Sequence, residues 1–422
     1  MSRAKRIRRV LLVVVAVLIL LPVTLLAAAY LTLRSEAGTA WVLEQIEGLT
    51  VEAGEGSVLA NWQAERVHWI GFGVQLELIQ PKLAWQPACL LRKQVCLDVL
   101  VADSIDLQMQ PDDTAEPEKP GPIRLPTVDI PLAVTIGEVR LGDFHFNNTL
   151  IWNHLVFSGE GSGSAVSIAG LKVEREALTV DVSGRVETRG DWPLNLDVLA
   201  NVPPPEGEAW ELDVALAGSV TDLRISGQSE GYLDATLDGQ LAPLKTELPA
   251  QLTLKSERFL ALATLPSTLA LENWTLAIDG SLAEGFSVDS RSRLPGARGA
   301  IELALTGLVT TQSANDLSLT LSAPYHREGK PSDLNVKGKV DWSEELRAES
   351  RFNLQAFPWY DLLPDMAPLP VTLSKLSGQA GYQAGEYQAD LSAEASGPLG
   401  VTTLETALDG DLSEVRLSTL KV

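Results

Sequence analysis

The sequence predicts an all-β protein in which a single N-terminal transmembrane helix precedes an elongated, lengthwise-curled β-sheet trough with an apolar interior. Three observations support this fold class. The chain starts with a basic cap and a long apolar run, and from about residue 50 onward apolar and polar residues alternate almost without interruption. The resulting number of strands is too large for one ordinary open sheet.

Residues 1–34 predict a cytoplasmic basic cap and a membrane anchor. The apolar run covers residues 10–33, and at 1.5 Å per residue a helix of this length spans about 36 Å, enough to cross a bilayer. Five cations precede it, at Arg3, Lys5, Arg6, Arg8 and Arg9. A cleaved signal peptide is the alternative, because Ala27–Ala29 offers a cleavage site, but signal peptides usually have a shorter apolar core. We favour the uncleaved anchor, and the positive-inside rule then places residues 35–422 outside the cytoplasm.

Residues 35–110 predict a short helix followed by closely spaced strands. The helix is expected over residues 38–48, with Thr39 as its cap and Gly48 at its end. Beyond it, glycine and proline punctuate short alternating stretches, which is typical of strands joined by tight turns.

The two cysteines of the chain, Cys89 and Cys96, lie in the segment CLLRKQVC between two strand-like stretches. A disulfide across this connection suits an oxidising compartment. Two free thiols are the alternative. The spacing does not fit a zinc site, because there is no C-x-x-C pair and no neighbouring histidine pair.

Residues 111–131 predict a linker, because this stretch is rich in proline and acidic residues and lacks periodicity. Residues 132–422 then predict one elongated β-groove region. Two of its segments, residues 257–266 and 354–366, break the alternation and are expected to be helical or coiled.

The apolar members of the alternating stretches fall at matched parity, so that each strand has one apolar face and one wet face. We predict that this apolar face lines a lipid groove. Its candidate residues are Leu178, Val180, Val182, Leu194, Leu196, Leu212, Val214, Leu216, Leu223, Ile225, Ile301, Leu303, Leu305, Leu317, Leu319 and Leu321.

The number of strands sets the architecture. At roughly 12–14 residues per strand and turn, the chain beyond the anchor gives about 25–30 strands, whereas open sheets rarely exceed about 10 without curling or splitting. One long sheet folded lengthwise into a trough satisfies this constraint. Several β-sandwiches in series, each with its own core, satisfy it equally well.

Charge and motifs argue against several functions. The formal net charge is −22, which disfavours nucleic-acid binding. The segment GQSEG around Ser229 matches a lipase nucleophile elbow, but the following residues alternate like a strand where that motif needs a helix. His145 and His154 lack nearby carboxylates at metal-ligand spacing. We therefore expect no catalytic residue, no metal and no cofactor.

The ordered segments SEAGTAWVLEQIEGLTVEAGEGSV, LELIQPKLAWQPACLLRKQVCLDVLVADSIDLQM, LPTVDIPLAVTIGEVRLGDFHF and LIWNHLVFSGEGSG make the chain resemble the N-terminal part of the TamB family, within the wider AsmA-like group. This resemblance is clearest over the first 170 residues. It implies a single-pass protein of the inner membrane of a Gram-negative bacterium, with the bulk of the chain in the periplasm. It also implies a β-sheet groove like that of bridge-like lipid transfer proteins.

The resemblance implies conduction of phospholipids between the inner and outer membranes in support of outer-membrane biogenesis. A chaperone-like scaffold within a translocation and assembly module, serving outer-membrane proteins and autotransporters, is the alternative function. Members of the family pair with the outer-membrane barrel TamA through a C-terminal domain. Our sequence stops in mid-pattern at EVRLSTLKV, so we expect a fragment or a shortened relative, for which docking to TamA is in doubt.

Overall fold

The computed structural model describes residues 24, 30–109, 125–326, 332–365, 372–397, 400–411 and 413–422. Most of the predicted membrane span at residues 10–33 and most of the predicted linker at 111–131 lie outside these ranges. None of the helices within the described ranges has both the length and the apolarity needed to cross a membrane. Apart from the helical residues 24 and 30–33, the helix α2 and three 3-10 turns, the regular structure of the described chain is β-strand, which confirms the all-β part of the predicted class.

Contacts divide the chain into two compact units. Unit 1 comprises Met1–Lys119 and Pro126–Gly190, and unit 2 comprises Pro120–Leu125 and Asp191–Val422. We predicted boundaries at residues 110 and 131 from the composition of the sequence. The division by contacts does not test these boundaries, and they stay a prediction.

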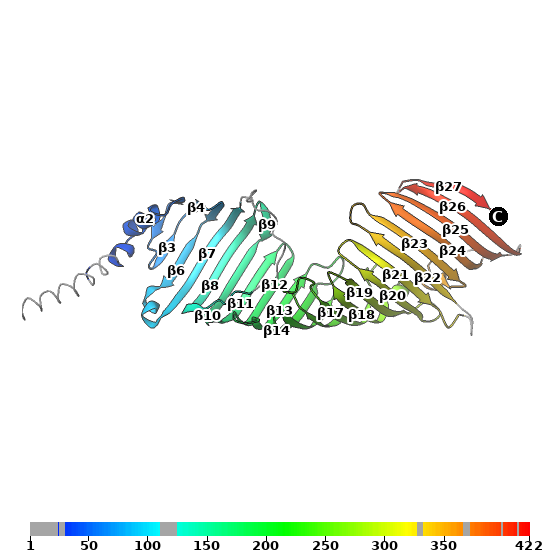
Figure 1. The fold of residues 1–422 in the computed structure, drawn as a ribbon, viewed down its shortest axis with the longest axis horizontal. Helices are drawn as coiled ribbons and strands as arrows, with labels where there is room; N and C mark the ends of the chain where they lie inside the picture. Colours follow the sequence, from blue (N-terminus) through cyan, green and yellow to red (C-terminus); the bar gives the residue numbers. More distant parts are fainter. Residues whose placement is uncertain are drawn as a thin grey trace, which may run out of the picture. The chain divides into compact units, whose positions relative to one another are not determined.

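Unit 1 contains the helix α2 (Glu36–Glu44), the 3-10 turn η1 (Pro87–Arg92) and twelve described strands. The strands are β1 (Leu49–Glu52), β2 (Glu55–Gly56), β3 (Asn61–Gln63), β4 (Arg66–Gly71), β5 (Val74–Ile79), β6 (Lys82–Gln86), β7 (Gln94–Met109), β8 (Ile130–Phe146), β9 (Thr149–Trp152), β10 (His154–Gly163), β11 (Ala165–Arg175) and β12 (Leu178–Glu187). The long strands β7 and β8 run parallel, and the other pairings between described residues of this unit are antiparallel. The blue-to-green part of Figure 1 shows these strands side by side.

The start of α2 forms a tight corner with the chain before it. Ser35, rather than Thr39, is the N-cap and accepts the Gly38 N–H, so our prediction of the helix start was wrong. Thr39 is buried instead. Its hydroxyl and that of Ser57 both donate to the Leu33 carbonyl, at 3.2 and 2.8 Å. A Cβ on Gly38 would lie 1.9 Å from the Thr32 carbonyl oxygen, so this corner requires glycine. The exit of residues 30–33 is therefore fixed against the sheet.

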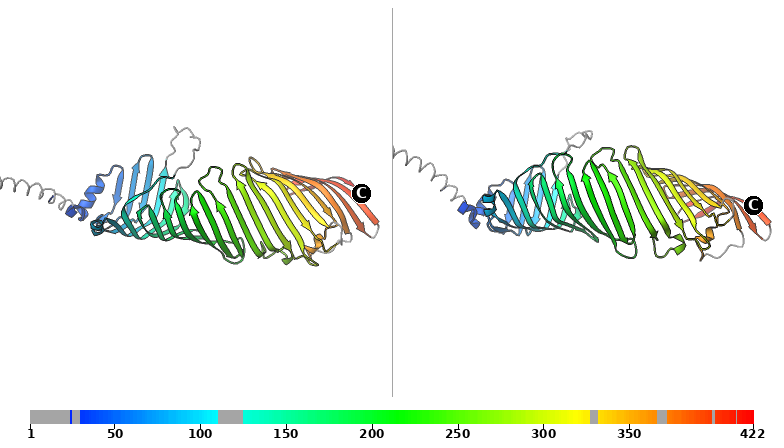
Figure 2. Two further views of the ribbon diagram at one scale, coloured as in Figure 1. Left: turned by 60° about the horizontal axis from the view of Figure 1, so that its bottom comes forward. Right: turned by 90° about the horizontal axis from the view of Figure 1, so that it is seen from below.

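Unit 2 contains fifteen strands joined in chain order by fourteen antiparallel pairings. They are β13 (Pro193–Val202), β14 (Trp210–Ser219), β15 (Asp222–Gly231), β16 (Ala235–Leu241), β17 (Ala250–Phe259), β18 (Leu271–Ser281), β19 (Gly285–Leu294), β20 (Ile301–Val309), β21 (Ser313–Ser322), β22 (Asp333–Asp341), β23 (Arg347–Gln355), β24 (Thr372–Gln383), β25 (Glu386–Gly397), β26 (Gly400–Asp411) and β27 (Val415–Lys421), with the 3-10 turns η2 (Ser267–Leu269) and η3 (Trp359–Asp361). Figure 2 shows that this sheet is curved rather than flat.

The described strands do not build the cores expected of sandwiches in series. Across the described residues only 16 apolar side chains are buried, five in unit 1 and eleven in unit 2. Seven of those in unit 2 form a single cluster at the ends of β19–β23. No pairing between described residues joins β27 back to β13, so the sheet of unit 2 is not closed into a barrel. An open, single-layer sheet is the architecture observed in unit 2.

Candidate functional site

The apolar face of unit 2 is continuous from strand to strand. The register places Val198 opposite Val214, Leu216 opposite Ile225, and Leu303 opposite Leu321. The same face continues through pairs such as Leu237–Leu254, Leu254–Leu276, Ile278–Val288, Leu319–Val336, Val336–Phe352, Leu354–Leu376 and Leu408–Leu417. We call this set the apolar row.

The groove residues predicted from the sequence belong to this pattern. Those on β13, β14, β15, β20 and β21 lie in the apolar row of unit 2. Leu178, Val180 and Val182 lie on β12 in unit 1, where Val180 faces Val173 and Val182 faces Leu171 across the pairing with β11. The structure thus distributes them over the two units and does not gather them into one compact pocket.

Burial distinguishes the two faces of the sheet. In β14 and β15, Leu212, Val214 and Ile225 are half-buried, whereas Asp213 and Arg224 between them are exposed. No second layer of described strands covers the row, which is why most of its members keep part of their surface in contact with solvent. Accessible apolar surface over so many strands makes this face the candidate binding surface of unit 2.

An aromatic ladder borders the row at one edge of β14–β18. Its rings lie in the order Trp210, Tyr232, Phe259 and Trp274, with successive centroids 5.6, 5.5 and 5.5 Å apart. The indole N–H of Trp210 donates to Ser229 at 2.7 Å, and that of Trp274 donates to Ser290 at 2.9 Å. Each polar tip therefore has a partner while the rings wall the edge of the apolar row.

A folded segment covers the row at the same edge of β19–β24. We call residues 356–365, which follow β23 and include η3, the clasp. Phe357, Trp359, Leu362 and Leu363 of the clasp pack on the strand-end residues Leu294, Ile301, Leu321 and Leu354, which are less than 9% exposed. We expected residues 354–366 to be helical or coiled, but nothing in their pattern predicted that they would fold over the apolar row.

One carboxylate, that of Asp361, ties the clasp to the neighbouring connections. The side chain of Asp361 is 2% exposed and accepts a hydrogen bond from Arg298 Nε at 2.8 Å and another from the Tyr325 hydroxyl. The hydrogen bond to the carboxylate raises the pKa of Arg298, and burial together with the same carboxylate raises the pKa of Tyr325. Both partners therefore keep their protons and donate to the Asp361 side chain, which is buried with two hydrogen-bond donors.

A hollow of about 840 Å³ lies on the opposite, polar side of the sheet over β21–β27. Its lining includes the outward-pointing charged side chains of Lys337, Glu349, Arg351 and Asp390. This hollow therefore differs in chemistry from the apolar row on the other face.

The structure gives no support to the catalytic alternative. Ser229 lies within β15, and the chain continues into β16, not into the helix that a nucleophile elbow needs. Its hydroxyl accepts from Trp210 and donates to the Leu233 carbonyl, so it has a structural role in the aromatic edge. Within the described residues no group of His, Cys, Asp and Glu side chains is arranged to hold a metal ion. A disulfide joins Cys89 of η1 to Cys96 of β7.

An open antiparallel sheet with one accessible apolar face in unit 2 defines the class: an all-β protein with an uncovered apolar sheet face. A family model described as TamB, N-terminal domain, matches residues 24–124 and 111–418, and the chain therefore belongs to this family. No curated protein and no solved structure matches the chain.

Proposed function

We propose that this protein conducts phospholipids between the inner and outer membranes along its apolar row. In this proposal, residues 1–34 anchor it in the inner membrane and the sheet lies in the periplasm. Membership of the TamB family supports a role in transport and assembly at the cell envelope. The observation that carries the finer proposal is the apolar row, which crosses fourteen consecutive strand pairings and keeps a half-exposed surface.

The physical argument rests on what such a surface would bind. Burying apolar area stabilises a complex by about 25 cal/mol per Å², and acyl chains supply that burial as well as protein side chains do. A row of similar Leu, Val and Ile side chains offers no single deep site, so a bound chain can move along it. The outward face carries exposed charges such as Asp213 and Arg224, which keep the other side of the sheet in water.

A scaffold for the assembly of outer-membrane proteins is the second candidate. Membership of the TamB family favours this role as well as a role in transport. In both proposals an outer-membrane barrel such as TamA is the expected partner by family resemblance.

The test compares a charge on the apolar row with the same charge on the outward face. Val214→Asp places an ion where acyl chains would lie, and should abolish phospholipid transfer because the ion is costly to desolvate. Ser226→Asp, on the exposed face of β15, is the matched control and should leave transfer unchanged. Both variants should fold and reach the membrane, as measured by protease resistance and by fractionation.

Photo-crosslinking amino acids give a direct readout of the same proposal. A crosslinker at position 214 should capture phospholipid, and one at position 213 should not. Equal capture at both positions would contradict a lipid path on the apolar row. Capture at neither position would favour the scaffold function.

A further inference from the structure

The clasp changes the exposure of the apolar row at one edge. On β20, Ile301 is 0% exposed beneath the clasp, whereas Leu305, four residues along the same face, is half-buried. On β21, Leu321 is 8% exposed and Leu319 is half-buried. A ligand lying on the row could contact Leu305 and Leu319 in this state, but the edge of β19–β24 is already occupied by the protein itself.

The polar ties of the clasp converge on Asp361 and its neighbour. The Ala297 N–H donates to the Asp361 carbonyl at 2.8 Å, and the Thr268 hydroxyl donates to the Leu362 carbonyl at 2.7 Å. Together with Arg298 and Tyr325, these contacts connect the clasp to the three connections β17–β18, β19–β20 and β21–β22. Loss of the Asp361 contacts would therefore loosen several connections at once.

The ion pair between Asp361 and Arg298 suits a contact that forms and breaks reversibly. A buried ion pair contributes little net stability compared with a well-packed apolar replacement, because both charges must be desolvated. The side chain of Arg298 is 51% exposed, so water can take over its hydrogen bonds when the pair separates. The clasp also begins at Ala356, whose φ of 45° lies in the left-handed region that disfavours residues with a Cβ.

We propose that the clasp is a releasable lid on the lipid path, with Asp361 as the positioning residue that latches it. Closed, it withholds the edge of β19–β24 from lipid; open, it extends the apolar row to that edge and admits acyl chains there. This inference rests on the proposed function, because it concerns access to the same row.

The first test removes the latch charge. In full-length protein in membranes, a photo-crosslinker at position 303, which packs against the clasp cluster, should capture less phospholipid than one at position 305. Asp361→Asn should raise capture at 303 several-fold, with 305 unchanged. Asp289→Asn is the matched control, because it removes an equivalent charge from the exposed Arg291–Asp289 pair on β19 and should change neither position.

The second test closes the lid permanently. Thr268→Cys combined with Leu362→Cys, bridged by a short bis-maleimide, should lower capture at 303 to background and slow phospholipid transfer. The same double variant left unbridged is the reference, because it too lacks the Thr268 hydroxyl and the buried Leu362 side chain. Equal capture at 303 and 305 in the wild type, unaffected by Asp361→Asn or by bridging, would overturn the lid. Absence of capture at 214 and 305 as well would instead overturn the proposed lipid path.

Hydrogen exchange separates release of the lid from unfolding. Asp361→Asn should speed exchange in residues 356–365 but not in β13–β18. If exchange rises throughout unit 2, Tyr325→Phe is the milder variant, since it keeps the ion pair and removes one donor. It should then raise capture at 303 to a smaller extent, and no rise at 303 in a folded Tyr325→Phe protein would count against the latch.

Discussion

The strands β19–β24 and β25–β27 share one sequence pattern but differ greatly in burial. Under the clasp, Ile301 and Leu354 are 0% and 5% exposed. In the last hairpin, Val415 and Leu417 are 68% and 55% exposed, although they alternate with polar residues in the same way.

The difference comes from the connections between the strands. Sixteen residues separate β23 from β24, and they include the apolar clasp. Two residues separate β25 from β26 and three separate β26 from β27, which is enough only for tight turns. Alternation thus produces a sheet whose apolar row is half-buried. The fully buried cluster of this sheet forms where a long apolar connection, the clasp, folds back over the row.

The largest expected effect is a difference in stability between these two regions. Ile301→Ala should cost about 2–5 kcal/mol in the free energy of unfolding, because it leaves a cavity in the only cluster of fully buried side chains found among the described residues of unit 2. Leu408→Ala, at a half-buried position of β26, should cost about 1 kcal/mol. Urea unfolding of the detergent-solubilised full chain measures both values. Similar losses would show that the clasp adds no core.

Local opening should follow the same order without any mutation. Backbone amides of β20 and β21 should exchange with solvent at least about 10-fold more slowly than those of β27, because strands under the clasp open only when its packing is lost. Native-state hydrogen exchange with mass spectrometry resolves the two regions. Faster exchange in β20 than in β27 would break the comparison.

The strands could be predicted from the sequence because their signal is local. Period-two alternation over WELDVALAGS and DLRISGQSEG coincides with β14 and β15, and the described residues form 27 strands, within the range expected from chain length. The start of α2 was misplaced because we chose Thr39 over Ser35. The N-cap preference of serine before an acidic first turn was the available signal.

The clasp could not be predicted because its contacts are not local. Asp361 is 63 residues from Arg298 and 36 from Tyr325, and none of the three stands in a motif. The only signal was that residues 354–366 interrupt the alternation with a dense apolar segment. A single sequence shows such an interruption but not the face on which it folds.

A smaller effect concerns the aromatic ladder, which borders the row without covering it. Trp274→Phe keeps the stacked contact with Phe259, whose ring lies at 19° to the indole, but removes the N–H that donates to the buried Ser290. The expected cost is about 1 kcal/mol. Trp342→Phe is the control, because Trp342 is 41% exposed and water can replace its donor to the Thr311 carbonyl. If Trp274→Phe and Trp342→Phe lowered the stability to thermal unfolding by the same amount, burial of the ladder would contribute nothing to this hydrogen bond.

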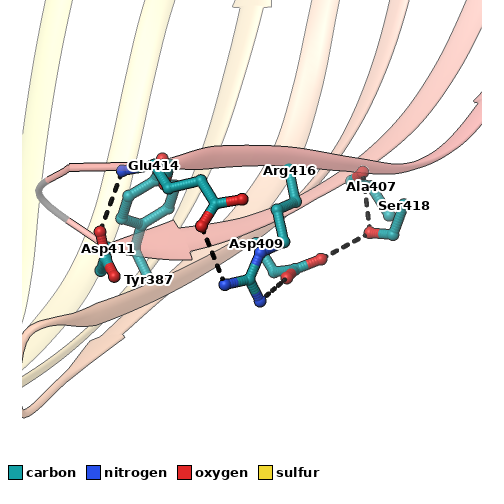
Figure 3. A network of polar contacts seen from close by, with 7 residues as sticks. All are labelled: Tyr387, Ala407, Asp409, Asp411, Glu414, Arg416 and Ser418. Atoms are coloured by element: carbon teal, nitrogen blue, oxygen red, sulfur yellow. Dashed lines mark hydrogen bonds and ion pairs between the residues drawn. The ribbon is translucent and has the colours of Figure 1, made fainter.

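The smallest expected effect lies in two turns of matching design, one in each region. In the β26–β27 turn, Asp411 Oδ1 accepts the Ser413 N–H and hydroxyl at 2.7 Å each. It also accepts the Glu414 N–H at 2.9 Å, and Figure 3 shows this hydrogen bond. In the β22–β23 turn, Asp341 accepts the Ser343 N–H at 3.1 Å and its hydroxyl at 2.6 Å. The serine hydroxyl and then the backbone N–H lower the pKa of both carboxyl groups.

We expect both turns to lose stability in acid, independently of the clasp. Because the folded pKa lies below the ordinary value, the stabilisation is complete above the unfolded carboxyl pKa and is lost as the pH falls through the folded one. Protection factors of the Ser413 and Ser343 amides, referenced to an unstructured peptide at each pH, should therefore fall together under acid. Asp411→Asn should remove the pH dependence at Ser413 only. Both carboxylates lie at turns on the solvated edge opposite the clasp, so their pKa values depend on local hydrogen bonds and on neighbouring cations such as Arg347 and Arg416. If the Asp341 turn stayed protected in acid while the Asp411 turn opened, the clasp would be stabilising a turn at the opposite edge of the sheet. The effect of the clasp would then not be confined to the residues that it covers, and the comparison of β19–β24 with β25–β27 would be wrong.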